Sequence, residues 1–454
     1  MQGRISLIFA SDLNGGIGYK GELPWSIPEE LKIFREKTMG KTLVMGRKTA
    51  ETLPKLDGDR KMYVLSRKIS SNFSNKNDYI FSKSIEDILE KEDHIFVIGG
   101  GEILNLVFNK YRHLIGLIHH SRIFNTHASD VHIHRSVFTP NKYQVLYHKS
   151  LPKFDHTVYK PYVEEKQYLD LLHDIIKEGY TSNTRNGITH SLFGKTLEFN
   201  LIHSFPLITT KKMFWRGIVE ELLMFIRGDT DTKQHLEEKA VMIWAGNTSE
   251  EFTTKQGLTL PAGDMGPMYG YQWRHFNKPY GNKPDSDGTY IDQLKYVVDT
   301  IKSNPTSRRI MMTTFNPAQV NEGVLYPCHS IILQFNVEYI DNISYIDTYC
   351  YNRSSDVFLG LPFNIASTTL LIKIIGKLTG TTPRKFTLAL GNAHIYFDHT
   401  VQAKTQMARE PYSFPDLVIE RAINTLEDIQ DLQYDDFKLK DYKHYSNIRA
   451  NMKI

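Results

Sequence analysis

Short apolar runs alternate with helical segments over the first third of the chain. Segments 28–38 and 102–108 have helical character and separate runs rich in β-branched residues, a pattern that predicts strands joined by crossover helices. Such connections imply a mainly parallel α/β sheet, with ligands at the carboxyl ends of its strands. The predicted strands are 5–10, 42–45, 62–65, 95–98 and 114–119, followed by an antiparallel pair at 143–148 and 156–162.

The apolar pattern lapses over residues 161–167. We therefore expect a first domain at 1–162, a short linker at 163–167 and a second domain at 168–454. The second domain mixes long helices with strands, which is typical of an α+β fold. Its predicted helices are 213–227, 291–302 and 364–379, and its clearest predicted strand is 331–339, in which Leu333, Phe335, Val337 and Tyr339 alternate with polar residues.

Composition places the chain among soluble globular proteins of two or three domains, with 454 residues, 41% hydrophobic and 23% charged. The net charge is +4 and the basic residues are scattered, so no basic stripe indicates nucleic-acid binding. Two cysteines exclude a disulfide framework and suit a reducing compartment. Neither a signal sequence nor a membrane-spanning apolar run is expected, and we predict a cytoplasmic protein.

The strongest chemical signal is a polar run, residues 352–356, that breaks directly into an apolar run closed by Asn364. Polar groups at the lip of a core need partners, and a bound ligand is one such partner. Cys328 stands about twenty residues earlier, between a proline and a histidine. Arg353 and the pair Arg308-Arg309 are candidates to lower its pKa and form a thiolate. The alternative is a buried, inert cysteine.

Pro327-Cys328-His329, followed by Tyr-Asn-Arg-Ser-Ser-Asp-Val-Phe-Leu-Gly-Leu-Pro-Phe-Asn-Ile-Ala-Ser over 351–367, closely resembles the active-site signature of thymidylate synthase, and the resemblance covers roughly 166–454. It implies that a Cys328 thiolate adds to C6 of dUMP and that methylenetetrahydrofolate supplies the methyl group and leaves as dihydrofolate. It also implies a homodimer in which Arg308 and Arg309 serve the partner's site. The expected dUMP ligands are Arg185, Arg308, Arg309, His329, Asn352, Arg353, Ser354, Asp356, Asn364, His394 and Tyr396.

Glu221 is conspicuous without any family knowledge, because it shares a helix face with Ile218, Leu222 and Phe225. A carboxylate in an apolar stripe is usually paired or functional, and the alternative is a glutamate bonded to a nearby lysine. By the resemblance, Glu221 organises the proton network around the pyrimidine and Tyr269 helps to remove the C5 proton. The expected methylenetetrahydrofolate ligands are Trp244, Asn247, Asp356 and Gly360, under a C-terminal tail that closes over the ligand.

Asn364 predicts the base. A side-chain amide can donate to O4 of uracil and accept from its N3–H, whereas cytosine presents the reverse pattern. A carboxylate at this position would instead have indicated a cytosine hydroxymethylase. The sequence departs from the synthase pattern at Asn352, usually glutamine, and at Ala245, usually aspartate.

In the first domain, Glu30 and Phe34 stand one turn apart on a predicted helix, where an acid and a ring could grip a flat heterocycle. Alone, Glu30 would be read as a solvated surface residue. Glycines open two predicted helices directly after strands, at 46–49 and 99–101, and helix N-termini of this kind bind phosphate. Arg47 and Arg67 add charge suited to an extra phosphate, which favours NADPH over NADH.

Together with Ile17-Gly18 and Leu23-Pro24-Trp25, these motifs make 1–162 similar to dihydrofolate reductase. The resemblance implies that Glu30 holds the pterin and promotes protonation at N5. The other expected dihydrofolate ligands are Ile8, Phe34, Arg60 and Ser121. The expected NADPH ligands are Ala10, Ile17, Gly46, Arg47, Lys48, Thr49, Ser66, Arg67, Gly99, Gly100 and Gly101. The sequence departs from this family at Ala50, usually tryptophan, and in the unusual pair His119-His120.

Joined in one chain, the two activities would close a cycle, because dihydrofolate released by the synthase-like part is the substrate of the reductase-like part. The resemblances imply NADPH and methylenetetrahydrofolate as cosubstrates and no metal. Two alternatives stay open at this stage. One is a pyrimidine nucleotide hydroxymethylase, and the other is a catalytically impaired dimeric scaffold or RNA-binding regulator.

Overall fold

The computed structural model describes residues 3–66, 78–111, 114–133, 143–161, 163–202, 204–281, 290–340 and 343–453. The chain forms two compact units, Met1–Tyr162 and Val163–Ile454, each with its own core. Lys166 and Gln167, which we expected in the linker, already lie in the first turn of helix α5. Glu165 just before them is buried and accepts hydrogen bonds from Thr209 and Thr210, so it belongs to the second unit.

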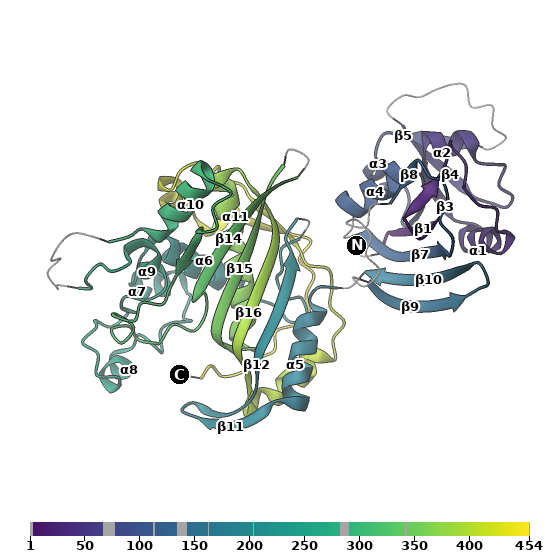
Figure 1. Cartoon of the computed structure of the whole chain (residues 1–454). Coiled ribbons are helices and arrows are strands. Elements are labelled where there is room, and N and C mark those ends of the chain that lie inside the picture. Colours follow the sequence, from purple (N-terminus) through teal and green to yellow (C-terminus); the bar gives the residue numbers. More distant parts are fainter. Residues whose placement is uncertain are drawn as a thin grey trace. The chain divides into compact units, whose positions relative to one another are not determined.

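An eight-stranded sheet forms the first unit, in the order β5-β4-β3-β6-β1-β7-β10-β9 (Figure 1). Pairing is parallel from β5 to β7, and β10 runs antiparallel to both β7 and β9. The predicted mainly parallel sheet with an antiparallel edge is therefore confirmed. Its strands are β1 (Ile5–Ser11), β3 (Thr42–Gly46), β4 (Lys61–Leu65), β5 (Tyr79–Ser82), β6 (Ile95–Gly99), β7 (Ile115–Ile123), β9 (Tyr143–Ser150) and β10 (Phe154–Pro161).

Helices of the first unit begin where the chain turns back from the sheet. Pro28 at the first position and the acidic Glu29 and Glu30 in the first turn favour the start of α1. The helix predicted after Gly46 is α2, whereas sequence reasoning missed β5, the small pair β2 and β8, and the short helix α3, because these elements are too brief to show a period. The helices are α1 (Pro28–Thr38), α2 (Arg47–Thr52), α3 (Ile85–Leu89) and α4 (Gly101–Lys110), and the small pair is β2 (Gly16–Gly18) with β8 (Val131–His132).

The second unit is built on a six-stranded sheet in the order β11-β12-β16-β15-β14-β13 (Figure 1). Only the β15–β16 pair is parallel, so the sheet is mixed. Its strands are β11 (Tyr180–Thr184), β12 (Gly187–Asn200), β13 (Met311–Thr313), β14 (Ile332–Ile340), β15 (Ile343–Asp356) and β16 (Thr382–Tyr396), and a separate ribbon pairs β17 (Asp416–Ile419) with β18 (Phe437–Lys440).

Helices accompany this sheet, which makes the unit α+β, as predicted. The α-helices are α5 (Lys166–Glu178), α6 (Trp215–Arg227), α7 (Thr232–His235), α8 (Glu250–Lys255), α9 (Gly270–His275), α10 (Gln293–Ser303), α11 (Gly360–Thr379) and α12 (Thr400–Met407). Short 3-10 turns are η3 (Glu237–Lys239), η4 (Phe397–His399), η5 (Glu427–Asp431) and η6 (Tyr434–Asp436).

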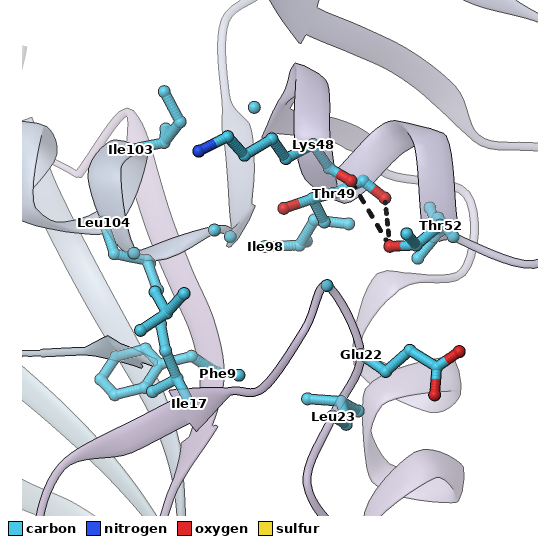
Figure 2. Close-up of a pocket in the computed structure, with 18 of the residues that line it drawn as sticks. Phe9, Ile17, Glu22, Leu23, Lys48, Thr49, Thr52, Ile98, Ile103 and Leu104 are labelled. Atoms are coloured by element: carbon cyan, nitrogen blue, oxygen red, sulfur yellow. Dashed lines mark hydrogen bonds between the residues drawn. The ribbon is translucent and has the colours of Figure 1, made fainter. Parts of the chain in front are cut away.

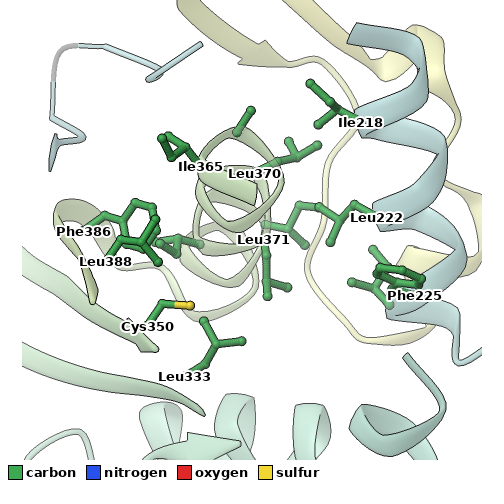
Figure 3. Packing of buried hydrophobic residues seen from close by; sticks show 14 of the residues in the cluster. Ile218, Leu222, Phe225, Leu333, Cys350, Ile365, Leu370, Leu371, Phe386 and Leu388 are labelled. Carbon is green, nitrogen blue, oxygen red and sulfur yellow. The ribbon is translucent and has the colours of Figure 1, made fainter. Parts of the chain in front are cut away.

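Helix α11 is the centre of the second core. Figure 3 shows Ile365, Leu370 and Leu371 of α11 between the sheet residues Leu333, Cys350, Phe386 and Leu388 and the α6 residues Ile218, Leu222 and Phe225. The helix is long and apolar enough to cross a membrane, but 78% of its most apolar stretch is buried within the fold, as in the core helix of a soluble protein. It ends at Gly380, whose φ of +69° suits glycine at a helix end.

Two predictions about these elements need correction. Helix α11 begins at Gly360, four residues before the predicted start, because the carboxylate of Asp356 accepts the backbone N–H groups of Phe358 and Leu359 and so organises the turn into the helix. Tyr339 was expected on the buried face of its strand with Leu333, Phe335 and Val337. It is 63% exposed, because the strand extends beyond the core at that end.

Candidate active sites

A cavity of about 1320 Å³ opens at the carboxyl ends of β1, β3 and β6 in the first unit. Its walls come from the β1 segment and its following loop, from α2 and from β6 with α4 (Figure 2). The cavity brings together Ile8, Ala10, Ile17, Glu30, Phe34, Gly46, Arg47, Lys48, Thr49, Arg60, Ser66, Gly99, Gly100 and Gly101. Ser121 lies behind Glu30, outside the lining, and Arg67 falls outside the described residues.

Glu30 is the buried acid of this cavity, with only 6% of its surface exposed. Burial raises the pKa of its carboxyl group, and a hydrogen bond from the Ser121 side chain opposes that rise. Phe34 lies one turn further along α1 and also lines the cavity. An acid with a raised pKa beside a ring can hold a flat heterocycle and keep a proton available near neutral pH.

Glycines at the starts of two helices also line the cavity. Gly46 precedes the first residue of α2, and Gly100 precedes the first residue of α4. A Cβ atom at Gly100 would lie 3.0 Å from Thr49 Oγ1, so a side chain there would crowd the approach of any ligand to the backbone. Arg47 is paired with Glu51, and Lys48 makes a 3.5 Å ion pair with Glu102. Both cations therefore stand at the cavity, but each already has a carboxylate partner.

The side chain of Arg60 is committed mainly to the protein itself. Its guanidinium donates to the backbone oxygens of Asp57 and Arg35 and to Thr38 Oγ1, the last at 3.3 Å. These bonds hold the loop after Thr52 against α1. Sequence reasoning missed Leu53, Pro54 and Leu56, which line the cavity in this loop. Their signal was a short apolar group in an otherwise polar segment.

Cys328 lies in the loop before β14 and is the centre of the site in the second unit. Its Sγ atom is 3.4 Å from the hydroxyl of Tyr269, and its backbone N–H donates to the same hydroxyl at 3.3 Å. The ring of Tyr269 is stacked between Phe225 and His329, with centroid distances of 5.1 and 4.3 Å. Arg353 fixes the loop by donating from Nε to the Pro327 carbonyl at 2.6 Å.

The groups around Cys328 act on the pKa of its thiol in opposite directions. Burial raises the pKa of the thiol above its usual value, although Tyr269 and the charge of Arg353 both lower it. His329 has a pKa of about 4 because it is buried, and is neutral at pH 7. Burial therefore works against the predicted thiolate, and Tyr269 and Arg353 work in its favour.

Glu221 faces the same region from α6. Its Oε1 accepts a 2.7 Å hydrogen bond from Trp244 Nε1, and burial raises its pKa to about 7. The backbone N–H of Asn247 donates to the Trp244 carbonyl at 3.0 Å, which ties this predicted residue to the same turn. A carboxyl group that is half protonated at neutral pH can both give and take a proton.

Asp356, His394 and Tyr396 form a second group of predicted residues. Asp356 raises the pKa of Tyr396 and opposes the burial-driven fall in the pKa of His394, so the three are electrostatically linked. The His394 and Tyr396 rings meet edge to face at 5.4 Å, and His394 Nδ1 lies 3.0 Å from Asn392 Oδ1. The charge of Arg185 opposes the rise in the pKa of Tyr396 that burial causes. Arg185 therefore lies close to the same group.

Some of the remaining predicted residues lie near Cys328 or Asp356, and others lie away from them. Gly360 and the half-buried Asn364 lie in the first turns of α11, directly after Asp356, and the Ser354 N–H donates to the Cys328 carbonyl at 3.3 Å. Asn352 is fully buried, with its Oδ1 accepting from Ser330 N at 2.8 Å. Arg308 and Arg309 are exposed at the end of α10, before β13.

Sequence reasoning missed Lys211, whose buried ammonium group donates to the Phe358 carbonyl and lies 4.0 Å from the Phe358 ring centre. Burial lowers its pKa to about 7, and the charge of Asp356 opposes the fall. The available signal was the polar stretch Thr209-Thr210-Lys211-Lys212 inside an apolar region.

The first unit thus has the cavity of an α/β reductase, and the second has a site built around a nucleophilic cysteine. Together they define an enzyme with two active sites. Comparison with known proteins agrees: the dihydrofolate reductase family model matches residues 4–164, and the thymidylate synthase model matches 166–454. The bifunctional dihydrofolate reductase-thymidylate synthase of Paramecium tetraurelia is 36% identical over 99% of this chain and 98% of its own. Those of Zea mays and Leishmania major are 34% and 32% identical over at least 95% of each chain.

The chain belongs to the bifunctional dihydrofolate reductase-thymidylate synthase family. It combines the reduction of dihydrofolate with the synthesis of dTMP, and it is an oxidoreductase and a methyltransferase of folate metabolism.

Proposed function

We propose that the second unit methylates C5 of dUMP through a covalent bond from Cys328, and that the first unit reduces the dihydrofolate formed with NADPH. The observation that supports this most directly is the grouping of Cys328 Sγ with the Tyr269 hydroxyl at 3.4 Å, a neutral His329 and a positively charged Arg353. Cys350 provides the contrast in the same chain: it is fully buried beneath α11, its Sγ lies 3.6 Å from Asn352 Oδ1, and no arginine or tyrosine of the described residues is among the groups that shift its pKa.

The synthase step begins when Cys328 Sγ bonds to C6 of the pyrimidine and the thiol proton leaves, so that the electron pair of the C5–C6 double bond moves to C5 and O4. Glu221, with a pKa of about 7, supplies and takes back protons around the ring. Tyr269 assists removal of the C5 proton. Methylenetetrahydrofolate supplies the methylene carbon and a hydride and departs as dihydrofolate, and the S–C6 bond breaks to release dTMP.

The phosphate of dUMP requires cations. Arg185 and Arg353 serve this role from the same chain, since both act electrostatically on members of the site. Ser354 extends the phosphate contacts. His394 and Tyr396 contact the ribose, Asn364 selects uracil, and Asp356, Trp244, Asn247 and Gly360 contact the folate. Asn352 supports the loop of Cys328 through its bond to Ser330 and contributes to the dUMP site from there.

Arg308 and Arg309 complete the partner's site in a homodimer. Their exposure supports this proposal, because neither side chain contributes to the Cys328 group of its own chain in the described residues. An uncovered face of the sheet supports it too: Met311, Gln334 and Tyr349 are direct neighbours across three strands, and Met311 and Tyr349 are 42% and 46% exposed.

Two free cysteines support a cytoplasmic location.

In the first unit, Glu30 binds the pterin edge and promotes protonation at N5, while Phe34 and Ile8 enclose the ring and Arg60 stands near the glutamate tail. NADPH, which supplies the hydride when bound, fits the wall of Gly46 and Gly99–Gly101 because the glycine at 100 leaves room beside Thr49. Ala10, Ile17 and Thr49 extend that wall. Arg47, Lys48, Ser66 and Arg67 provide for its extra phosphate.

A coupled assay tests the whole proposal. NADPH oxidation by the full chain should depend on both dUMP and methylenetetrahydrofolate, and Cys328→Ala should abolish that dependence while direct reduction of added dihydrofolate continues. Tritium release from C5-labelled dUMP, measured together with dTMP formation, separates the alternatives. Release without dTMP would indicate a hydroxymethylase, and no release would indicate a catalytically impaired scaffold.

A further inference from the structure

Three residues from three elements form a row that starts at the reductase cavity and runs into the core. Glu30 of α1 lines the cavity, and the Ser121 hydroxyl of β7 is close enough to act on its carboxyl group and oppose the rise in its pKa. Ser121 Oγ lies 3.2 Å from His156 Nδ1 of β10. Ser121 and His156 are direct partners across the two strands and are each only 2% exposed. The row is therefore fixed by the sheet and shielded from water.

The hydroxyl in the middle of the row has a single proton. When Ser121 donates that proton to the Glu30 carboxylate, the bond to His156 can form only if Nδ1 carries a proton and donates to Ser121. The other nitrogen, Nε2, is buried without a partner among the described residues. A proton on Nε2 would leave a buried donor unbonded, which is rarer in proteins than an unused acceptor. The geometry therefore favours the tautomer with its proton on Nδ1.

The His156 ring is neutral at working pH. Burial lowers its pKa to about 4. Lys37 of α1 acts on it as a positive neighbour, and His119 and His120 of β7 also lie close, with pKa values of about 4 and 3. The His119 ring is roughly parallel to that of His156 at 6.0 Å but makes no hydrogen bond to Ser121 that is seen in the described residues. His156 is thus neutral in this pH range, whereas burial raises the pKa of the Glu30 carboxyl group.

We propose that His156 is a positioning residue for dihydrofolate reduction: its Nδ1–H holds the Ser121 hydroxyl so that the hydroxyl proton points to Glu30. The proposal rests on the role given to Glu30 above. A hydroxyl held in this direction stabilises the carboxylate and limits the rise in pKa that burial causes. His156 therefore helps to set the pH range over which Glu30 can hold a proton, although it does not line the cavity.

The test is the pH profile of dihydrofolate reduction by the full chain. In His156→Phe the ring is kept but the donor is lost, so the hydroxyl is free to turn and the carboxylate is stabilised less. The alkaline limb of the profile should move to higher pH, and the ratio of the rate at pH 8 to that at pH 6 should rise about threefold, as expected for one weakened hydrogen bond. His156→Asn places an amide N–H near the position of Nδ1 and should restore the original profile.

Two internal controls belong to the same chain. dTMP synthesis depends on the second unit and should be unchanged in every variant, which reports the amount of folded enzyme. His119→Phe replaces the neighbouring imidazole by a phenyl ring without removing a bond to Ser121, and it should keep the original profile. Glu30→Gln tests the role of the acid itself: if reduction and its pH dependence survive that change, the role of Glu30 fails, whatever His156 does.

A double variant tests whether His156 acts on Glu30 through the Ser121 hydroxyl. Ser121→Ala should move the profile in the same direction as His156→Phe, and adding His156→Leu to Ser121→Ala should move it no further. The proposal is overturned if His156→Phe keeps the original profile, if His156→Asn shifts it as much as the phenylalanine does, or if the shifts of the double variant add. If His156→Phe does not accumulate as folded protein, the comparison of Ser121→Ala with the double variant Ser121→Ala, His156→Leu decides the question.

Discussion

The phenol oxygen of Tyr269 lies 3.4 Å from Cys328 Sγ and also accepts the Cys328 backbone N–H at 3.3 Å. One oxygen thus fixes both the sulfur and the main chain of the nucleophile. Tyr269 can do this because its ring is held between Phe225 and His329 and because its backbone has a φ of +39° at the start of α9. The nucleophile of the synthase site is therefore positioned by a residue 59 positions away in sequence.

Tyr269→Phe should lower the rate of dTMP synthesis by about a hundredfold, the lower range for loss of a positioned acid or base. The ring stacks remain and only the hydroxyl is lost, so the fold should persist. Steady-state rates of both activities are the measurement. Dihydrofolate reduction should be unchanged, and an unaltered rate of dTMP synthesis would show that the hydroxyl has no part in the reaction.

The rate of alkylation should differ between the two cysteines, because their environments differ. Because burial raises the pKa of Cys328, its reaction with iodoacetamide should accelerate up to at least pH 9 without reaching a plateau. Cys350, with a pKa of about 12 and no exposed surface, should stay unmodified in the folded protein. Mass spectrometry after timed alkylation distinguishes the two sites.

Arg353→Met removes the positive charge that lowers the pKa of Cys328, so the midpoint of the alkylation profile should move to higher pH. Arg309→Met is the matched control, because it removes a charge from an exposed position outside the Cys328 group of the same chain. A midpoint that moves equally in both variants would mean that net charge, and not the local field of Arg353, governs the thiol.

The sequence predicted the long elements well, because their periods extend over many residues. Helix α1 was predicted from residue 28 to 38, and these are its observed bounds. The start of α11 was misplaced because it depends on the carboxylate of Asp356 accepting two backbone N–H groups, a local contact that apolar periodicity does not record. Elements of two to five residues, such as β8 and α3, were missed because they contain too few positions to show a period.

The candidate sites were predictable where a motif carries the chemistry, as with Cys328 and the glycine turns. The effect of burial on the pKa values of Cys328 and His329 was not predictable, because it depends on how far the fold buries the sulfur and the imidazole ring. Lys211 illustrates the same limit. Its ammonium group is buried against the Phe358 ring and carbonyl, and those partners are 147 residues away in sequence.

Glu221→Gln should stabilise the protein at alkaline pH while it impairs dTMP synthesis. The pKa of Glu221 is about 7 in the folded protein and near 4.5 when unfolded, so folding takes up a proton between these values. The ionised, buried form is disfavoured above pH 7, by up to about 3 kcal/mol of unfolding free energy relative to pH 4.5 and below. The neutral amide of glutamine avoids this loss.

The melting temperature of the Glu221→Gln variant should therefore exceed that of the unmodified chain more at pH 8 than at pH 5. Glu220→Gln is the control on the same helix, because Glu220 is paired with Lys239 at 2.6 Å and its loss should not produce this dependence. A difference in melting temperature that is the same at both pH values would contradict a raised pKa at Glu221.

Asn364→Asp should change the preferred base. The amide can donate to O4 of uracil and accept from its N3–H, whereas a carboxyl group that accepts from the cytosine amino group suits dCMP. A site built to hydrogen-bond one base leaves buried groups unpaired with the other, so we expect the rate with dUMP to fall by at least a hundredfold. Tritium release from C5-labelled dCMP should become detectable at the same time. Asn364→Ala is the control for loss of contact alone: it should weaken the reaction of dUMP without any release from dCMP, and equal behaviour of the two variants would remove Asn364 from base selection.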